Sequence, residues 1–227
     1  MRQYYEYEGG YGADAQWKSI IERQNTPLVE VAMWNDYTES SYFQPTRVLH
    51  AADKGMTSFP HLGYYELTKY YIKWYKTGRA PAITKDAIFY FYRTQPKDAV
   101  APNDSTTCDK PIRQDKLFGN VQDDIYVTTA LTKPAILHVV SGGASYNIKV
   151  GAGIQHTKVP FTPGHQTFEI VRHGEVLTHS QGTDIDSAPQ YKNFGNTSGY
   201  SVVGGSNSDN WLPSDKWQTG YNSDWFK

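Results

Sequence analysis

The hydrophobic pattern of the chain changes near Pro81, and this change limits the folds open to it. Before Pro81, apolar residues recur at helical spacing over 15–23 and 62–76, and the near-continuous apolar run 28–34 lies between them. After Pro81 no further helical period appears, and short alternating segments follow one another about every ten residues. The sequence therefore predicts an α/β part followed by an all-β part.

In the α/β part the expected order is helix, strand, long loop, helix. Residues 25–27 end the first helix, and the run 28–34 predicts a buried strand of a parallel sheet, because a strand covered on both faces is apolar throughout. The second helix is followed by Gly78, at the position of a capping glycine, and by Pro81 as a stop.

The all-β part has strands bounded by turn residues such as Gly142-Gly143 and His173-Gly174. This spacing predicts an antiparallel β-sandwich. We expect residues 193–227 to form an irregular tail anchored by Trp211, Trp217 and Trp225. The expected strands are 87–93, 124–131, 135–140, 145–150, 154–159, 166–172 and 175–181.

Charge and cysteine content exclude several classes of partner. With 22 Lys and Arg against 23 Asp and Glu, the chain lacks the basic excess that nucleic-acid binding needs. No run approaches the ~20 apolar residues of a membrane span, and the N-terminus does not have the apolar core of a signal peptide. The single Cys108 cannot form an intrachain disulfide or a CxxC zinc site. Sequons at Asn103 and Asn196 fit a secreted glycoprotein or a chance match equally well.

Polar side chains concentrate where the predicted strand 28–34 ends. Trp34, Asn35, Asp36, Tyr37 and Glu39 lie within six positions of one another. The carboxyl ends of parallel strands are where ligands bind in barrels and open α/β sheets, so this position favours a binding site. The alternative is a plain turn in which Asn and Asp bond to their own backbone.

A pair of carboxylates can hydrolyse a glycosidic bond. One carboxylic acid protonates the leaving oxygen, and the other carboxylate activates water or attacks the anomeric carbon. Asp36 and Glu39 would form this pair, and Asn35 would contact sugar hydroxyls. Aromatic residues make up 15% of the chain, and Trp34, Tyr37 and Tyr42 would offer flat faces to sugar rings, although core packing explains such aromatics equally well.

Four ordered segments carry a more specific signal: VEVAMWNDYTESSY at 29–42, PHLGYYELTKYYI at 60–72, YKTGRAP at 75–81 and YFYRTQPKD at 90–98. Together they resemble glycoside hydrolase family 71, the α-1,3-glucanases or mutanases known largely from fungi. The resemblance is specific over residues 10–100 and weaker through the β-rich part. Fungal members usually have Gly in place of Thr38 and His in place of Ser41, so contacts around the pair are expected to differ.

The resemblance implies a (β/α)8 barrel followed by a β-sandwich, and inverting hydrolysis of α-1,3-glucan with no metal or organic cofactor. It places the two catalytic acids on Asp36 and Glu39. We assign Asp36 as general base and Glu39 as general acid, although the sequence leaves the reverse assignment open. The family histidine at the start of the next helix falls on His61, as a partner of substrate or carboxylate or as a structural residue. Tyr64 in the same motif is a further substrate-binding candidate.

The length of the α/β part does not match a whole barrel. A (β/α)8 barrel takes ~250 residues, whereas only about 80 precede the β-rich part, enough for about the last two units. We therefore expect residues 1–82 to be the C-terminal part of a barrel, 83–192 the sandwich and 193–227 the tail. The chain would then be a fragment, a truncated product or half of an assembly, whose partner is the missing N-terminal barrel segment. The parent enzyme would act outside the cell or in the cell wall.

Two other functions remain open at this level. The chain could be a non-catalytic carbohydrate-binding module that grips polysaccharide through its sandwich and tail aromatics, or an inactive remnant. Calcium is not expected at the loop acids Asp104, Asp109, Asp123 and Asp124, because their spacing does not match a calcium-binding loop.

Overall fold

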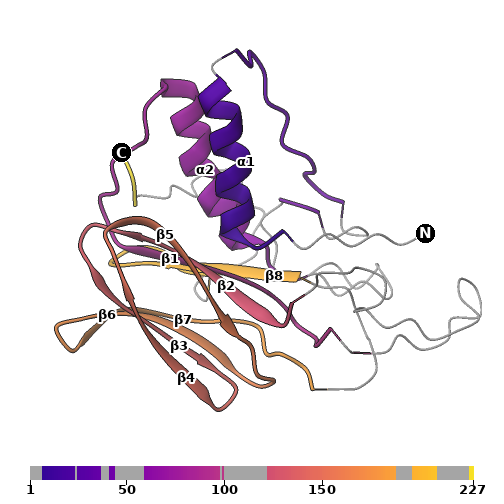
Figure 1. The fold of residues 1–227 in the computed structure, drawn as a ribbon, viewed down its shortest axis with the longest axis vertical. Coiled ribbons are helices and arrows are strands. Elements are labelled where there is room, and N and C mark those ends of the chain that lie inside the picture. The colour runs from indigo at the N-terminus through magenta and orange to yellow at the C-terminus, as the bar shows by residue number, and fades with distance from the viewer. Residues whose placement is uncertain are drawn as a thin grey trace, which may run out of the picture.

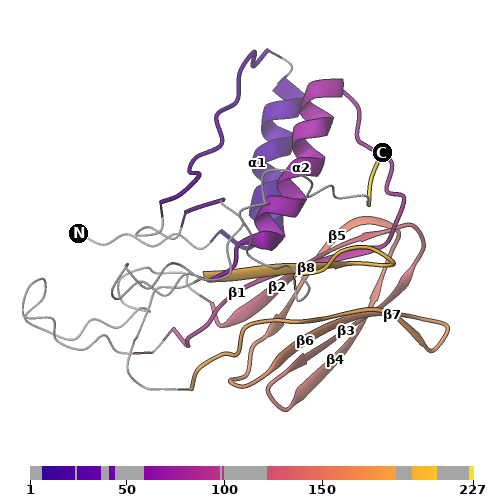
Figure 2. The ribbon, with the colours of Figure 1, turned by 180° about the vertical axis from the view of Figure 1, so that it is seen from behind.

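The computed structural model of the chain describes residues 7–23, 25–36, 41–43, 59–97, 99, 122–187, 196–208 and 225–227. Two helices cover one face of a β-sheet, and a second sheet covers its other face (Figures 1 and 2). In chain order the elements are α1 (Gly10–Arg23), α2 (Leu62–Thr77), β1 (Ala87–Arg93), β2 (Asp124–Leu131), β3 (Ala135–Ser141), β4 (Ala144–Val150), β5 (Gly153–Pro160), β6 (Gln166–Arg172), β7 (Glu175–Gln181) and β8 (Asn196–Val202).

The strands form two four-stranded sheets within the described residues. The first sheet has the order β5-β2-β1-β8 and the second the order β4-β3-β6-β7. Every pairing inside the sheets is antiparallel. The seven strands expected from the alternating pattern are all present, so the prediction of antiparallel β-structure after Pro81 is confirmed.

Strand β1 is the centre of the structure, because all seven of its residues are buried. Phe89 and Phe91 pack in the apolar cluster under the helices. Tyr90 and Tyr92 point the opposite way, into the cluster between the two sheets. There the ring of Tyr90 stacks on Phe168 of β6, with centroids 4.0 Å apart and planes 6° apart. A strand buried on both faces explains why AIFYFYR has no polar residue before its last position.

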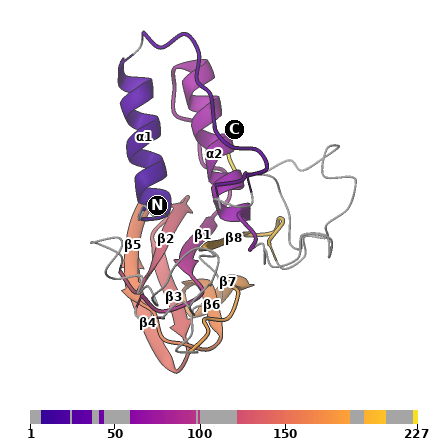
Figure 3. The ribbon, with the colours of Figure 1, turned by 90° about the vertical axis from the view of Figure 1, so that its right-hand side faces the viewer.

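The helices contact the sheet mainly through their N-terminal parts. Buried residues of α1 end at Trp17 and those of α2 end at Tyr71, and Figure 3 shows both helices rising from the first sheet. The capping prediction at Gly78 is confirmed, since its φ of 68° is left-handed and its N–H donates to the Trp74 carbonyl at 2.8 Å. No helix among the described residues is long and apolar enough to cross a membrane.

The prediction of a buried strand at 28–34 is wrong for this structure. These residues form no regular secondary structure and pair with no strand among the described residues. Leu28 is 81% exposed, and Val31, Met33 and Trp34 are also exposed. A continuous apolar run indicates a buried strand only where neighbouring strands are present to cover it. No closed barrel forms within the described residues.

The expected irregular tail contains a regular strand instead. Residues 196–202 form β8, which pairs antiparallel with β1 over its whole length. The anchoring role of Trp225 is confirmed: its ring is fully buried and stacks on Tyr70 of α2 at 5.2 Å. Trp211 and Trp217 lie outside the described residues. The boundaries at 82 and 192 stay a prediction.

A buried carboxylate joins α1 to the rest of the helical layer. The hydroxyl of Tyr71 on α2 donates to Asp14 at 2.6 Å, and Lys18 lies 2.8 Å from the other carboxylate oxygen. Nε2 of His156 on β5 lies 3.4 Å from that second oxygen. Burial alone would raise the pKa of Asp14, but the hydrogen bonds from His156, Lys18 and Tyr71 outweigh it and lower the pKa to about 2. Asp14 therefore holds two helices and one strand together as an anion.

We predict that Asp14→Asn destabilises the chain at neutral pH by about 2 kcal/mol, the value that corresponds to the lowered pKa. Because the pKa in the folded state lies below the unfolded value, this stabilisation is complete above about pH 4 and is lost as the pH falls toward 2. Urea denaturation at pH 7, 5 and 3 would measure it. Exposed Glu22 on the same helix supplies the control Glu22→Gln. A stability difference that does not shrink between pH 5 and 3 would contradict the ionic role.

Candidate active site

The expected catalytic acids belong to a loop closed at its base by backbone hydrogen bonds. The N–H of Phe43 donates to the Met33 carbonyl at 2.8 Å, and the N–H of Met33 donates to the Ser41 carbonyl at 3.3 Å. Within the loop the N–H of Ser41 donates to the Asp36 carbonyl at 3.3 Å. We call residues 33–43 the carboxylate loop. These bonds bring residue 33 close to residues 41 and 43.

The first half of the carboxylate loop lies at the surface. Trp34 is 43% exposed, Asn35 is exposed and Asp36 is partly exposed. These three expected site residues are consecutive and accessible, as contact with a polymeric ligand requires. Tyr37 and Glu39 lie outside the described residues, so their roles stay predictions.

The last part of the loop is buried against the start of α2. Tyr42 is 2% exposed, and its hydroxyl donates to the Phe59 carbonyl. Its ring stacks on the His61 ring, with centroids 4.0 Å apart and planes 8° apart. His61 is itself 3% exposed. Burial of both rings favours a supporting role over direct sugar contact in this structure.

Both nitrogens of the His61 ring contact backbone carbonyls. Nδ1 lies 2.8 Å from the Tyr42 oxygen, and Nε2 lies 2.9 Å from the oxygen of Asn196, the first residue of β8. Burial lowers the pKa of His61, and these two hydrogen bonds oppose that effect. The ring thus links the carboxylate loop to the first sheet.

Tyr64 completes an aromatic group beneath the loop. Its ring meets His61 edge-on at 6.1 Å and packs on Phe91 of β1 at 4.5 Å. Its backbone N–H donates to the Ser198 hydroxyl at 3.3 Å, and the Asn196 side-chain amide donates to its hydroxyl at 3.5 Å. Tyr64 is partly exposed, whereas His61 and Phe91 beside it are buried.

The contribution of β8 to this region could not be foreseen from the motif series. Asn196 and Ser198 follow the loop by more than 130 residues, and Gly199 weakens the strand pattern there. The structure explains Gly199, because a Cβ on it would lie 2.1 Å from the Tyr90 hydroxyl. The β-branched and aromatic residues Thr197, Tyr200 and Val202 were the available signal for a strand.

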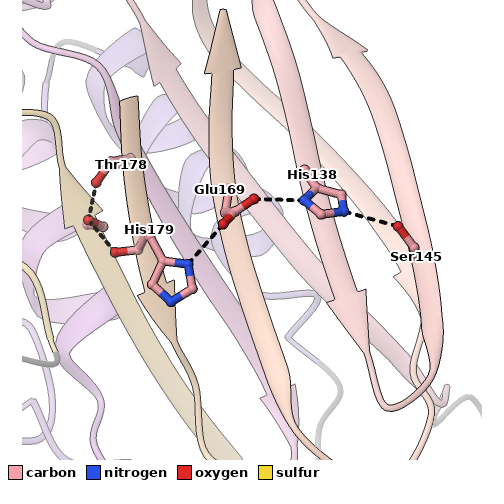
Figure 4. A network of polar contacts seen from close by, with 6 residues as sticks. His138, Ser145, Glu169, Thr178 and His179 are labelled. Atoms are coloured by element: carbon pink, nitrogen blue, oxygen red, sulfur yellow. Dashed lines mark hydrogen bonds and ion pairs between the residues drawn. The ribbon is translucent and has the colours of Figure 1, made fainter. Parts of the chain in front are cut away.

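A second cluster of titratable side chains lies on the outer face of the second sheet (Figure 4). Glu169 of β6 accepts hydrogen bonds from His138 of β3 at 2.8 Å and from His179 of β7 at 3.1 Å, one on each carboxylate oxygen. The hydrogen bond from His138 is the largest cause of the lowered pKa of Glu169. In both histidines Nδ1 contacts the Glu169 carboxylate. The three side chains therefore link β3, β6 and β7 through cross-strand pairs.

Among the described residues, no group of three or more His, Cys, Asp or Glu side chains is arranged to hold a metal ion. Two of the loop acids have other partners: Asp123 lies 2.7 Å from Arg93, and Asp124 lies 2.7 Å from Lys158. Asp104 and Asp109 are outside the described residues.

A comparison with models of known protein families shows which family the chain belongs to. The model of glycosyl hydrolase family 71 matches residues 5–210. The chain belongs to glycosyl hydrolase family 71. The match runs from α1 through β8, so the two sheets belong to the same family unit as the carboxylate loop.

The similarity extends to individual family 71 proteins. A mutanase of Penicillium rubens is 36% identical over 185 residues, which cover 79% of this chain and 40% of that protein. The glucan endo-1,3-alpha-glucosidase agn1 of Schizosaccharomyces pombe is 30% identical over 183 residues, covering 79% of this chain and 42% of its own. The ascus wall endo-1,3-alpha-glucanase of the same yeast is 28% identical over 187 residues, covering 74% and 41%. No solved structure shows a significant match.

We predict that Gly199→Ala disturbs the support of the carboxylate loop. Its added methyl group would lie 2.1 Å from the Tyr90 hydroxyl and 2.3 Å from its ring, so β8 must shift, at a cost of about 1–3 kcal/mol. Thermal unfolding would measure the loss. Gly143→Ala is the control, because a Cβ at that hairpin position meets nothing within 4 Å. Equal thermal stability of the two variants would contradict the prediction that the close packing of β8 on β1 leaves no room for a side chain at residue 199.

Proposed function

We propose that this chain carries the catalytic carboxylates of an α-1,3-glucan hydrolase, and that Asp36 and Glu39 act together by inversion. The observation that carries the proposal is the accessible Asp36 in a loop closed at its base, within a chain of glycosyl hydrolase family 71. The relatives named as mutanase and endo-1,3-alpha-glucanase support α-1,3-glucan as the substrate.

In the proposed reaction Asp36 is the general base. It removes a proton from a water molecule, whose oxygen attacks the anomeric carbon from the face opposite the leaving group. Glu39 as general acid gives its proton to the glycosidic oxygen as that bond breaks, so the product anomer is inverted. A water molecule between base and sugar requires the two carboxyl groups to be ~6.5–9.5 Å apart.

Trp34 and Asn35 would bind the glucan next to the reacting bond. The indole of Trp34 is 43% exposed and offers a flat apolar face to a pyranose ring, while the Asn35 amide can donate to one hydroxyl and accept from another. Tyr37, Tyr42, His61 and Tyr64 are proposed to shape the same end of the site, the buried Tyr42 and His61 by supporting the loop from below.

The chain spans about 40% of the length of the relatives it matches. We propose that α1, residues 28–34 and α2 form the last units of a (β/α)8 barrel, completed in a longer parent protein by chain that precedes them. The exposed apolar side chains Leu28, Val31 and Met33 support this, because they lie where a barrel strand would find neighbours on both sides. The name of the ascus wall relative supports a cell-wall or extracellular site of action.

The direct test measures reducing sugar released from insoluble α-1,3-glucan, by this chain and by a longer family 71 protein carrying it. Asp36→Asn and Glu39→Gln should each lower the rate by about 100-fold or more, because each removes a proton-transfer group. Asp184→Asn is the matched control, since Asp184 is an exposed acid paired with His165. Full activity of either loop variant would overturn the site assignment.

The same assay separates an enzyme from a binding module. The proposal predicts that wild-type protein releases sugar from the glucan it binds. Binding without release, in the longer protein as well as in this chain, would support the module, and absence of both would support a remnant. Trp225 is fully buried and so could not serve a module as a sugar platform.

The roles of the two acids can be separated with an α-1,3-linked oligosaccharide that carries fluoride at its reducing end. Fluoride leaves without protonation, so Glu39→Gln should retain most activity on this substrate and Asp36→Asn should not. NMR of the first product should show the β-anomer. The reverse pattern of activities would exchange the roles, and an α-anomer would exclude inversion.

A further inference from the structure

We propose that His61 is a positioning residue, which fastens the end of the carboxylate loop to the junction of α2 and β8 and so sets where Asp36 lies. This role rests on the proposed function of the loop, although the contacts that carry it do not. The ring is 3% exposed, so it acts through the backbone that it holds and not through the sugar.

Both partners of the ring are main-chain atoms. Its nitrogens lie 2.8 Å from the Tyr42 carbonyl oxygen and 2.9 Å from that of Asn196. A bond to a carbonyl fixes the path of the backbone, whereas a bond to a side chain leaves rotamers free. The two partners, Tyr42 and Asn196, are 154 positions apart in the sequence, so the ring joins two distant parts of the chain.

The Tyr42 carbonyl is well placed to control Asp36. It lies between Ser41 and Phe43, and both of these residues are bonded into the base of the loop. The Ser41 N–H donates to the Asp36 carbonyl itself at 3.3 Å. A displacement of the Tyr42 backbone is therefore transmitted to the Asp36 backbone through one hydrogen bond.

The far side of the link is rigid. Residue 61 forms a parallel bridge with Ser198, whose N–H donates to the Pro60 carbonyl at 2.7 Å. Next to it, a Cβ on Gly63 would lie 2.7 Å from the Gly199 carbonyl oxygen, so the start of α2 sits directly on β8. The loop is thus attached to a closely packed junction between α2 and β8.

Protonation changes this link. A neutral imidazole has one N–H and can donate to only one of the two carbonyls. The imidazolium could donate to both, but burial disfavours its charge by more than the hydrogen bonds favour it. Because burial lowers the pKa of His61, acid favours states in which the ring reaches water, so the link holds at neutral pH and weakens as the pH falls below about 6.5. The phenols of Tyr42 on the loop and Tyr64 on α2 are titratable groups that face the ring. Asn196 and Ser198 face it from β8 and do not titrate.

The test uses amide hydrogen exchange of the intact chain at Met33 and Phe43, the two amides that close the loop. Asn places its amide nitrogen near the position of Nδ1, and Gln places its amide nitrogen near Nε2. His61→Asn should therefore keep the bond to the Tyr42 carbonyl and exchange like wild type. His61→Gln and His61→Phe should exchange at least about 10-fold faster at these amides. Exposed His165 gives the control His165→Gln.

Amides of β3 and β6 report whether a variant has simply lost global stability. Faster exchange at Met33 and Phe43 with unchanged exchange at Val139 and Phe168 supports positioning. Equal acceleration everywhere, or no difference between His61→Asn and His61→Gln, overturns it. Wild-type loop exchange, corrected for the intrinsic rate, should also rise between pH 7 and 5, and His61→Asn should remove that rise.

Activity in the longer family 71 protein supplies the second readout. His61→Gln should lower kcat by about 10-fold or more and change KM less, because the substrate still meets Trp34 while Asp36 is displaced. If Asp36→Asn leaves activity intact, the proposed function fails while the exchange result stands. If Asp36→Asn abolishes activity but His61→Gln changes neither exchange nor kcat, the positioning role alone fails.

Discussion

The burial of β1 on both faces is the constraint on which the rest of the structure depends. A strand in that position needs a complete apolar layer above it and another below it. The helices supply the first layer through Leu67 and Tyr71, and the second sheet supplies the other through Phe168 and Ile170. β8 then occupies the edge of the first sheet next to β1, and its first residues lie under the carboxylate loop. The place of the loop therefore follows from how the β1 strand is covered.

This arrangement gives the β-sheets a part in the site. In the motif series alone, the sandwich is a separate unit that follows the catalytic one. In the structure, Asn196 and Ser198 from β8 contact His61 and Tyr64, which support the loop. The match of the family to residues 5–210 includes both parts and agrees with one continuous unit. We infer that removing the β-rich part would leave Tyr42 and the loop without their support.

Local patterns were sufficient to predict seven strands and the end of α2. Along each strand either apolar and polar residues alternate, or Gly and Pro mark its ends. Gly78 supplies the left-handed cap of α2, so in both cases the information is local. Two failures have non-local causes. Residues 28–34 are apolar enough for a buried strand, but burial depends on neighbours, and Leu28 is 81% exposed. β8 was missed because the glycine in it is required by close contact with Tyr90, a residue more than a hundred positions away. For the site, the motif series singled out Asp36, which lies partly exposed in the carboxylate loop, whereas the backbone contacts of His61 could be seen only in three dimensions.

We propose that the carboxylate loop is the sugar-binding surface of this chain. Titration of the isotope-labelled chain with an α-1,3-linked glucose tetrasaccharide, followed by NMR, tests it most directly. We expect the largest chemical-shift changes at the Trp34 indole and at the amides of Asn35 and Asp36. Changes confined to the outer face of the second sheet, around His138, Glu169 and His179, with none in the loop, would contradict it.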